Sequence, residues 1–141
     1  MKHFMSQYVK ALKKCIEACD KTYESNQVLS EVCSINLNKK CAAQLGKTVK
    51  LSDSCIKSCE AVIKECTFHI RTCENKKCVQ KCNACIKACK AAIATCQKSI
   101  KECDAHTVKC ISLSFTGMKK LIACGQACQA CLAHGHSLAN K

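Results

Sequence analysis

The chain of 141 residues carries 18 cysteines, 4 glycines, no proline and a formal net charge of +13. Cysteine at this level normally indicates a disulfide scaffold, but such scaffolds are rich in turns and loops. The scarcity of glycine and proline therefore argues against a loop-rich scaffold and favours long helices. Lysines spread over the whole chain and an aromatic content of only 4% make nucleic-acid binding a weak interpretation.

The N-terminal stretch indicates the compartment. Residues 1–14 contain no apolar run of the kind that a secretory signal needs, and no part of the sequence is apolar enough to span a membrane. We therefore expect a cytoplasmic protein. In that compartment thiols stay reduced, and clustered cysteines more often bind metal or act in catalysis.

Candidate helix breaks lie at residues 24–26, 46–53, 74–77 and 104–107. They divide the chain into five expected helices, at about residues 3–24, 27–46, 53–74, 77–104 and 107–134. We expect residues 1–141 to form a single all-α domain. Its fold would be an antiparallel four-helix bundle with a thiol-lined core, in which one of the five segments is an accessory helix unless one of the breaks is absent.

The cysteines repeat with the spacing of the inner face of a helix. In residues 77–104, Ala92 and Ser99 fill the gaps between cysteines and complete an unbroken four-three alternation. Residues 53–74 and 107–134 show the same pattern, whereas the first two segments carry only two cysteines each. Branched aliphatic residues follow one position after the cysteines, and lysines occupy the outer face. The pattern predicts helices that present rows of thiols to a common core.

Two interpretations without metal compete for these cysteines. Cysteine as a small buried hydrophobe accounts for one or two positions, but not for 18. Disulfides within one helix are excluded for the C-x6-C pairs. Residues seven apart lie about 10.5 Å apart along the helix, and a disulfide needs Cα atoms within about 7 Å. Bridges between helices stay open, so a disulfide-stapled structural or interaction protein remains an alternative.

Metal binding explains why the cysteines are arranged in rows. Thiolates are soft ligands that select cuprous copper, zinc or iron–sulfur clusters. Zinc sites usually take four ligands, often from C-x2-C turns, and the only two such spacings, Cys82/Cys85 and Cys128/Cys131, fall within expected helices. The compact loop spacings of iron–sulfur proteins are absent. Cuprous copper accepts two or three sulfurs, so the spacing favours copper and leaves a zinc-thiolate buffer as an alternative.

The candidate metal ligands are all the cysteines together with one histidine. His69 lies on the thiol row of its segment, where a ligand and a residue at the edge of the core are equally good interpretations. The roles of His106, His134, His136, Met1 and Met5 stay open. Nothing singles out one cysteine as a nucleophile, so no catalytic residue and no enzyme is predicted. The predicted ligands are Cys15, Cys19, Cys33, Cys41, Cys55, Cys59, Cys66, Cys73, Cys78, Cys82, Cys85, Cys89, Cys96, Cys103, Cys110, Cys124, Cys128, Cys131 and His69.

Three stretches carry a resemblance to a known family. Residues 33–46, CSINLNKKCAAQLG, look like the second helix of the copper storage proteins, and residues 123–131, ACGQACQAC, look like the final helix of that family. Residues 78–89 have its C-x3-C-x2-C-x3-C pattern. The resemblance implies a four-helix bundle whose core thiols bind many Cu(I) ions, loaded through one open end lined by histidine or methionine. It also implies the cytosolic branch of the family and a homo-oligomer, often a tetramer.

The resulting functional expectation is a cytoplasmic store that sequesters several Cu(I) ions per chain on cysteine thiolates. Copper ions are the expected partners, together with a copper chaperone or efflux protein that supplies or receives them. No nucleic acid and no membrane is expected to bind. The first two helices depart from the family pattern because each carries only two cysteines, so that side of the core is expected to hold less copper.

Overall fold

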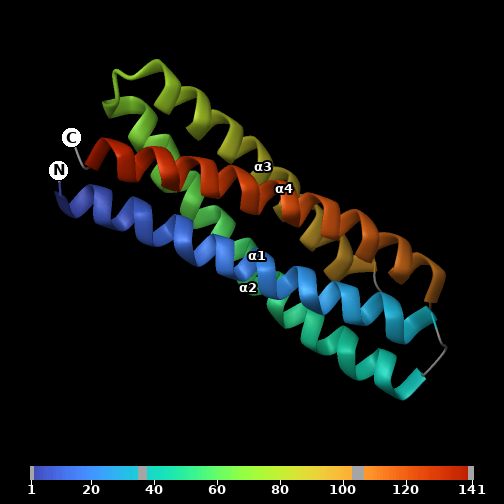
Figure 1. The fold of residues 1–141 in the computed structure, drawn as a ribbon. Coiled ribbons are helices and arrows are strands. Elements are labelled where there is room, and N and C mark those ends of the chain that lie inside the picture. Colours follow the sequence, from blue (N-terminus) through green and yellow to red (C-terminus); the bar gives the residue numbers. More distant parts are fainter. Residues whose placement is uncertain (1, 35–37, 103–106, 140–141) are drawn as a thin grey trace.

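Four long helices make up the part of the chain that the structure describes, residues 2–34, 38–102 and 107–139 of a computed structural model (Figure 1). No strand occurs in these ranges, which confirms the predicted all-α four-helix bundle. The absence of proline allows each helix to run for 27 to 35 residues without a kink-forming residue. In chain order the helices are α1 (Lys2–Ser34), α2 (Asn38–Thr72), α3 (Lys76–Glu102) and α4 (Thr107–Ala139).

The helices form an antiparallel ring, in which α1 and α3 each pack against both α2 and α4. Figure 1 shows the start of α1 and the end of α4 beside the connection from α2 to α3. We call this the α2–α3 end of the bundle. At the opposite end, α1 passes into α2 and α3 passes into α4. Residues that occur in order along one helix therefore occur in reverse order along its neighbours.

The expected breaks at residues 24–26 and 46–53 do not occur, because α1 and α2 run through them. The polar residues there bond to their own helix instead of ending it. The Asn26 amide donates to the Thr22 carbonyl at 2.9 Å, and the Thr48 hydroxyl donates to the Gln44 carbonyl at 2.8 Å. Gly46 costs about 1 kcal/mol inside a helix, which a long, packed helix tolerates. The described residues therefore contain four helices and no accessory helix.

Cysteine side chains make up most of the core. One cluster of buried side chains fills the bundle from the α2–α3 end to beyond its middle, and Tyr8, Leu12, Val62, Ala92 and Leu121 are its main members without sulfur. The branched aliphatic row predicted beside the thiols is largely half-buried against this cluster, as at Ile63, Ile86 and Ile93. We call the following buried cysteines of this cluster the thiol column: Cys15, Cys19, Cys55, Cys59, Cys66, Cys82, Cys85, Cys89, Cys96, Cys124, Cys128 and Cys131.

A band of buried polar side chains ends the thiol column. Each helix contributes to it at the point where the cysteine row is interrupted. Beyond the band, toward the opposite end, lies a second small cluster that contains Leu29, Cys33, Cys41, Cys110 and Leu113. Hard oxygen donors are poor ligands for soft metal ions, so this band separates the two groups of cysteines chemically. We call it the polar layer, and it contains Thr22, Ser25, Asn26, Thr48, Ser52, Ser99 and Ser114.

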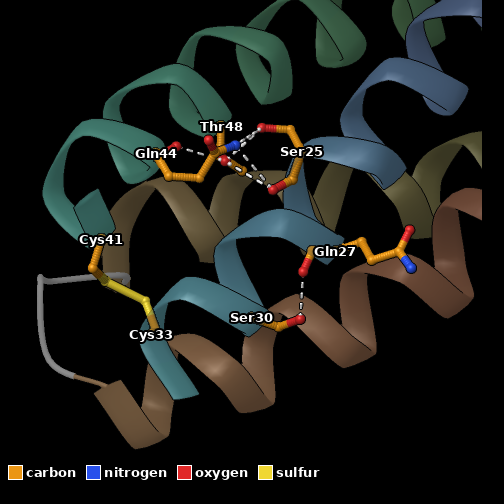
Figure 2. Close-up of a disulfide and its surroundings, with 7 residues drawn as sticks. All are labelled: Ser25, Gln27, Ser30, Cys33, Cys41, Gln44 and Thr48. Carbon is orange, nitrogen blue, oxygen red and sulfur yellow. Dashed lines mark hydrogen bonds between the residues drawn. A yellow bond between two sulfur atoms is a disulfide. The ribbon is translucent and has the colours of Figure 1, made fainter. Parts of the chain in front are cut away.

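Hydrogen bonds join the α1 and α2 members of the polar layer (Figure 2). The hydroxyls of Ser25 and Thr48 lie 2.7 Å apart, and the Gln44 amide donates to the Ser25 hydroxyl at 2.9 Å. The Thr22 hydroxyl lies 2.7 Å from the Ala18 carbonyl on its own helix and 3.2 Å from the Leu51 carbonyl on α2. Buried polar groups that are satisfied in this way hold two helices in one register.

Replacing Thr48 with valine should destabilise the metal-free protein by about 1–2 kcal/mol, because it removes a buried hydroxyl and leaves the Ser25 hydroxyl with fewer partners. Thr67→Val is the matched control, since the Thr67 hydroxyl makes the same kind of bond to its own helix but is exposed. Urea denaturation of both variants under reducing conditions measures the difference. Equal costs at the two positions would contradict a stabilising role for the polar layer.

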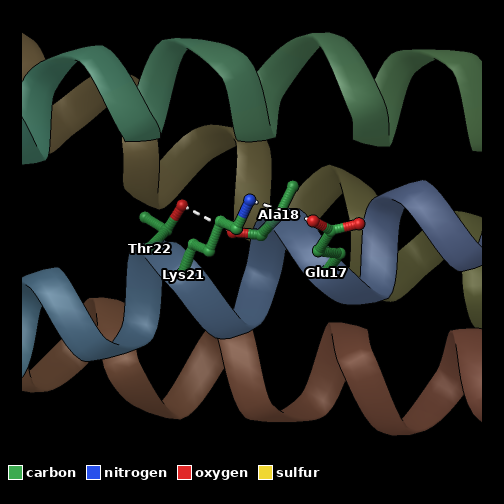
Figure 3. A network of polar contacts seen from close by, with 4 residues as sticks. All are labelled: Glu17, Ala18, Lys21 and Thr22. Carbon is green, nitrogen blue, oxygen red and sulfur yellow. Dashed lines mark hydrogen bonds and ion pairs between the residues drawn. The ribbon is translucent and has the colours of Figure 1, made fainter.

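The outer face is basic and carries ordinary surface ion pairs. Lys21 and Glu17 lie one turn apart on α1, and the Nζ atom of Lys21 is 2.9 Å from the Oε1 atom of Glu17. The pair lies close to the buried Thr22 hydroxyl (Figure 3). The hydrogen bond and the charge of Lys21 lower the pKa of the exposed Glu17 carboxyl. Lys57 and Asp53 form a similar pair at 3.6 Å on α2. Among the described helices, none has the length and apolar character needed to cross a membrane.

Candidate metal centre

Sulfur atoms from different helices meet across the bundle axis. The Sγ atom of Cys59 on α2 lies 3.6 Å from that of Cys15 on α1 and 3.8 Å from that of Cys124 on α4. The Sγ atom of Cys124 also lies 3.6 Å from that of Cys89 on α3. All four side chains are fully buried. The thiol rows therefore converge from all four helices, as the heptad spacing predicts.

These contacts assemble two groups of four thiols that have members in common. In each group the sulfur atoms all lie within 4.8 Å of one another. Cys15 and Cys124 belong to both groups, so the two groups together contain six different thiols. The groups are Cys15, Cys89, Cys124 and Cys128, and Cys15, Cys19, Cys59 and Cys124. A shared thiolate can bridge two metal ions, so the groups form one continuous cluster.

A third group lies closer to the α2–α3 end and has three thiols, Cys66, Cys85 and Cys131. It connects to the first group because the Sγ atoms of Cys85 and Cys128 lie 3.6 Å apart. Toward the polar layer the column continues through Cys55, whose Sγ atom lies 3.9 Å from that of Cys19. Thiol groups therefore follow one another along the bundle, and each is within reach of the next.

The fourth group lies at the α2–α3 end, and we call it the α2–α3 site. It contains His69 and Cys73 near the end of α2 and Cys78 at the start of α3. The Nε2 atom of His69 lies 2.8 Å from the Sγ atom of Cys78. His69 and Cys78 are buried, whereas Cys73 is half-buried. The structure thus places His69 beside two thiols that are able to hold a metal ion with it.

Burial and hydrogen bonding set the protonation of this part of the core. Burial is the main cause that raises the pKa of Cys78, to about 12, so its thiol is neutral until a metal ion displaces the proton. Burial also raises the pKa of Tyr8 well above its ordinary value, so the phenol stays a donor. Hydrogen bonds from Cys131, Cys66 and Tyr8 lower the pKa of Cys82. Along α3, Cys82 lies between the α2–α3 site and the third group.

Cys33 and Cys41 depart from the predicted ligand set, because a disulfide joins them (Figure 2). The prediction treated them as eight residues apart along one helix. In the structure Cys33 ends its thiol row on α1 and Cys41 begins one on α2, so the chain reversal brings their Cα atoms to 5.3 Å. With their sulfurs bonded to each other, these two cysteines offer no thiolate. Cys110 is buried in the same cluster.

Thiol counting should therefore depend on reduction. Protein purified without reductant and denatured under acid should react with a thiol reagent at two fewer positions than the fully reduced protein. Peptide mapping should assign both missing positions to Cys33 and Cys41. The variant Cys33→Ser/Cys41→Ser is the control, because its count should not change on reduction. Bridges that involve thiols of the column would contradict the structure.

The remaining predicted or open positions are only partly described. Cys103 and His106 lie outside the described residues, as do the side chains of His136, Met1 and Met5. His134 is half-buried on α4, one turn beyond Cys131 toward the α2–α3 end. Its Nε2 atom is buried and has no hydrogen-bond partner among the described residues. His134 thus lies toward the α2–α3 end of the bundle and belongs to none of the four groups found among the described residues.

Tyr8 is the functional candidate that sequence reasoning missed. It precedes Cys15 by seven residues and therefore shares the inner face of α1 with the cysteines. In the structure its ring stacks on His69 and its hydroxyl lies 3.2 Å from the Sγ atom of Cys82. A polar aromatic residue in a row of cysteines was the available signal, because a buried tyrosine hydroxyl needs a partner.

Comparison of the chain with protein-family models, curated proteins and solved structures found no match. The class of protein is therefore defined by the fold and the site alone. It is a cysteine-rich four-helix bundle whose buried thiol groups are able to hold metal ions.

Proposed function

We propose that this protein stores several Cu(I) ions on the cysteine thiolates of its core. The observation that carries the proposal is the sequence of connected thiol groups along the bundle axis, of which two share Cys15 and Cys124. Independent sites would not need shared ligands. A store of many ions needs shared ligands, because bridging thiolates hold more ions per cysteine.

The number of ligands favours copper. The third group has three thiols, and the α2–α3 site has two thiols and His69. Structural zinc sites are almost always four-coordinate, whereas Cu(I) is satisfied by two or three soft ligands. The basic surface also suits this cargo, because anionic copper–thiolate sites inside the bundle are partly offset by a net charge of +13. The resemblance to copper storage proteins agrees with this choice.

A zinc-thiolate buffer is the second candidate, and one observation favours it. Six thiols in two groups of four, with two thiols in common, suit a pair of zinc ions with two bridging sulfurs. Zinc would then occupy the middle of the column and leave the groups of three ligands without a fitting ion. The two candidates therefore differ in the metal and in how many groups it fills.

Competition for the reduced metal-free protein separates these candidates. The protein is exposed without air to equal concentrations of a Cu(I) donor and zinc, and the bound ions are identified by native mass spectrometry. We expect Cu(I) to bind and to displace zinc that was loaded first. Retention of two zinc ions in the presence of Cu(I) would instead support the zinc buffer.

The proposal places the store in the cytoplasm, without catalytic turnover and as a homo-oligomer. Two apolar side chains on one face of α4 support self-association, since Phe115 and Ile122 lie two turns apart and are each about half exposed. Light scattering of the purified protein tests this part. A monomer at micromolar concentration would contradict the oligomer and leave the storage function untouched.

A further inference from the structure

Near the α2–α3 end, α1 contributes an aromatic residue where the other helices contribute cysteines. The first buried cysteine on α1 is Cys15, and Tyr8 and Leu12 take the inner positions before it. Among the described residues, Tyr8 is the largest of the fully buried side chains, with only 1% of its surface exposed. A side chain of this size on the bundle axis occupies space that metal ions would otherwise use.

Two contacts hold the ring of Tyr8 in place, one to the α2–α3 site and one to the thiol column. On one side the ring stacks on His69, with 4.8 Å between the centroids and 17° between the planes. On the other side the hydroxyl lies 3.2 Å from the Sγ atom of Cys82. His69 belongs to the α2–α3 site, whereas Cys82 belongs to the thiol column. Tyr8 therefore connects the two.

Cys82 is the natural first acceptor of an ion that leaves the α2–α3 site. It follows Cys78 by one turn of α3, a rise of about 6 Å. Cys85 of the third group lies three residues further along the same face of α3, and the other two thiols of that group are buried in the same core cluster as Cys82. An ion that passes from Cys78 to Cys82 therefore reaches the third group in the next step. This step takes the ion past the ring of Tyr8.

We propose that Tyr8 sets the rate at which Cu(I) passes between the α2–α3 site and the thiol column. The proposal rests on the storage function. Ions move between thiolates by ligand exchange, in which a new sulfur coordinates before the old one dissociates. The ring must move aside for this exchange, and the movement breaks the stack on His69 and the hydroxyl contact with Cys82. Since Tyr8 supplies no sulfur ligand, it governs the rate and leaves the number of stored ions unchanged.

Release kinetics test this role. Wild type, Tyr8→Phe and Tyr8→Ala are loaded anaerobically with the same number of Cu(I) ions and mixed with excess bathocuproine disulfonate, and absorbance follows the transfer of copper. Tyr8→Phe keeps the ring but removes the hydroxyl contact, so we expect release about threefold to tenfold faster. Tyr8→Ala removes the ring as well, and its release should be faster still.

Two matched variants control for general effects. Tyr23→Phe removes the hydroxyl of a half-buried tyrosine on the same helix, and Leu121→Ala truncates a buried core residue on α4. Both should release copper at the wild-type rate. Circular dichroism checks the folding of every variant, and Tyr8→Phe alone decides the question if Tyr8→Ala does not fold.

The outcomes separate this proposal from the storage function. Faster release by the Tyr8 variants with an unchanged number of bound ions supports control by Tyr8. Unchanged or slower release with an unchanged number of ions would overturn it while the storage function stands. A wild type that binds only one or two ions would overturn both. A smaller number of ions in Tyr8→Phe alone would assign Tyr8 to the ligand set and contradict a purely kinetic role.

Discussion

Replacing Cys124 with serine should remove more than one Cu(I) ion per chain from the saturated protein. Cys124 belongs to both four-thiol groups, and its sulfur lies 3.8 Å from that of Cys59 and 3.6 Å from that of Cys89. Serine has nearly the same shape but offers a hard oxygen, which is a poor ligand for Cu(I). One substitution therefore weakens every ion that the shared sulfur would bridge. Anaerobic titration of the variant measures the loss.

Cys96→Ser is the matched control for this prediction. Cys96 is also buried in the thiol column, but among the described residues it belongs to none of the four groups. Its substitution should cost at most one ion. Equal losses for Cys124→Ser and Cys96→Ser would indicate independent sites and contradict a cluster with shared thiolates.

Loading with Cu(I) should raise the thermal midpoint of unfolding by about 15 °C or more. A ligand that binds only the folded state at a thousand times its Kd adds about 4 kcal/mol for one site. One kcal/mol corresponds to about 4 °C for a domain of this length. Several buried ions that join all four helices should add to this effect, since the thiol groups draw on α1, α2, α3 and α4.

Calorimetry under anaerobic conditions checks the stabilisation by copper. Removal of the metal by a Cu(I)-selective chelator should return the midpoint to the metal-free value, which serves as the internal control. A shift of only a few degrees at saturation would mean that copper binds at the surface or also to the unfolded chain. Either result would contradict burial of the ions in the core.

The thiol column could be predicted from the sequence because heptad spacing fixes one face of a helix. Cys82, Cys85 and Cys89 share that face whatever the boundaries of the helix are, and the structure buries them together. The grouping of thiols from different helices could not be predicted. The contact between Cys15 and Cys59 depends on how far α1 and α2 are shifted along each other. The spacing of the cysteines on either helix alone does not give this shift.

Two predictions were wrong, the helix breaks within α1 and α2 and the two cysteines that form a disulfide, and both have the same origin. Polar residues such as Asn26 and Thr48 indicated helix breaks, but α1 and α2 pack together and turn those residues into a buried layer. Cys33 and Cys41 were predicted as ligands on one helix, whereas the reversal from α1 to α2 lies between them and a disulfide joins them. In both cases local sequence preferences gave way to a contact between helices. The position of that contact along the chain is set by the whole bundle.

Anaerobic titration of the reduced, metal-free protein with Cu(I) in the presence of a calibrated Cu(I)-selective competitor tests the storage function most directly. The four groups of ligands on the described part of the chain, with their shared and neighbouring thiols, predict at least four tightly bound ions per chain. The competitor should take up copper only after these ions are bound. Saturation at one or two ions per chain would contradict a copper store.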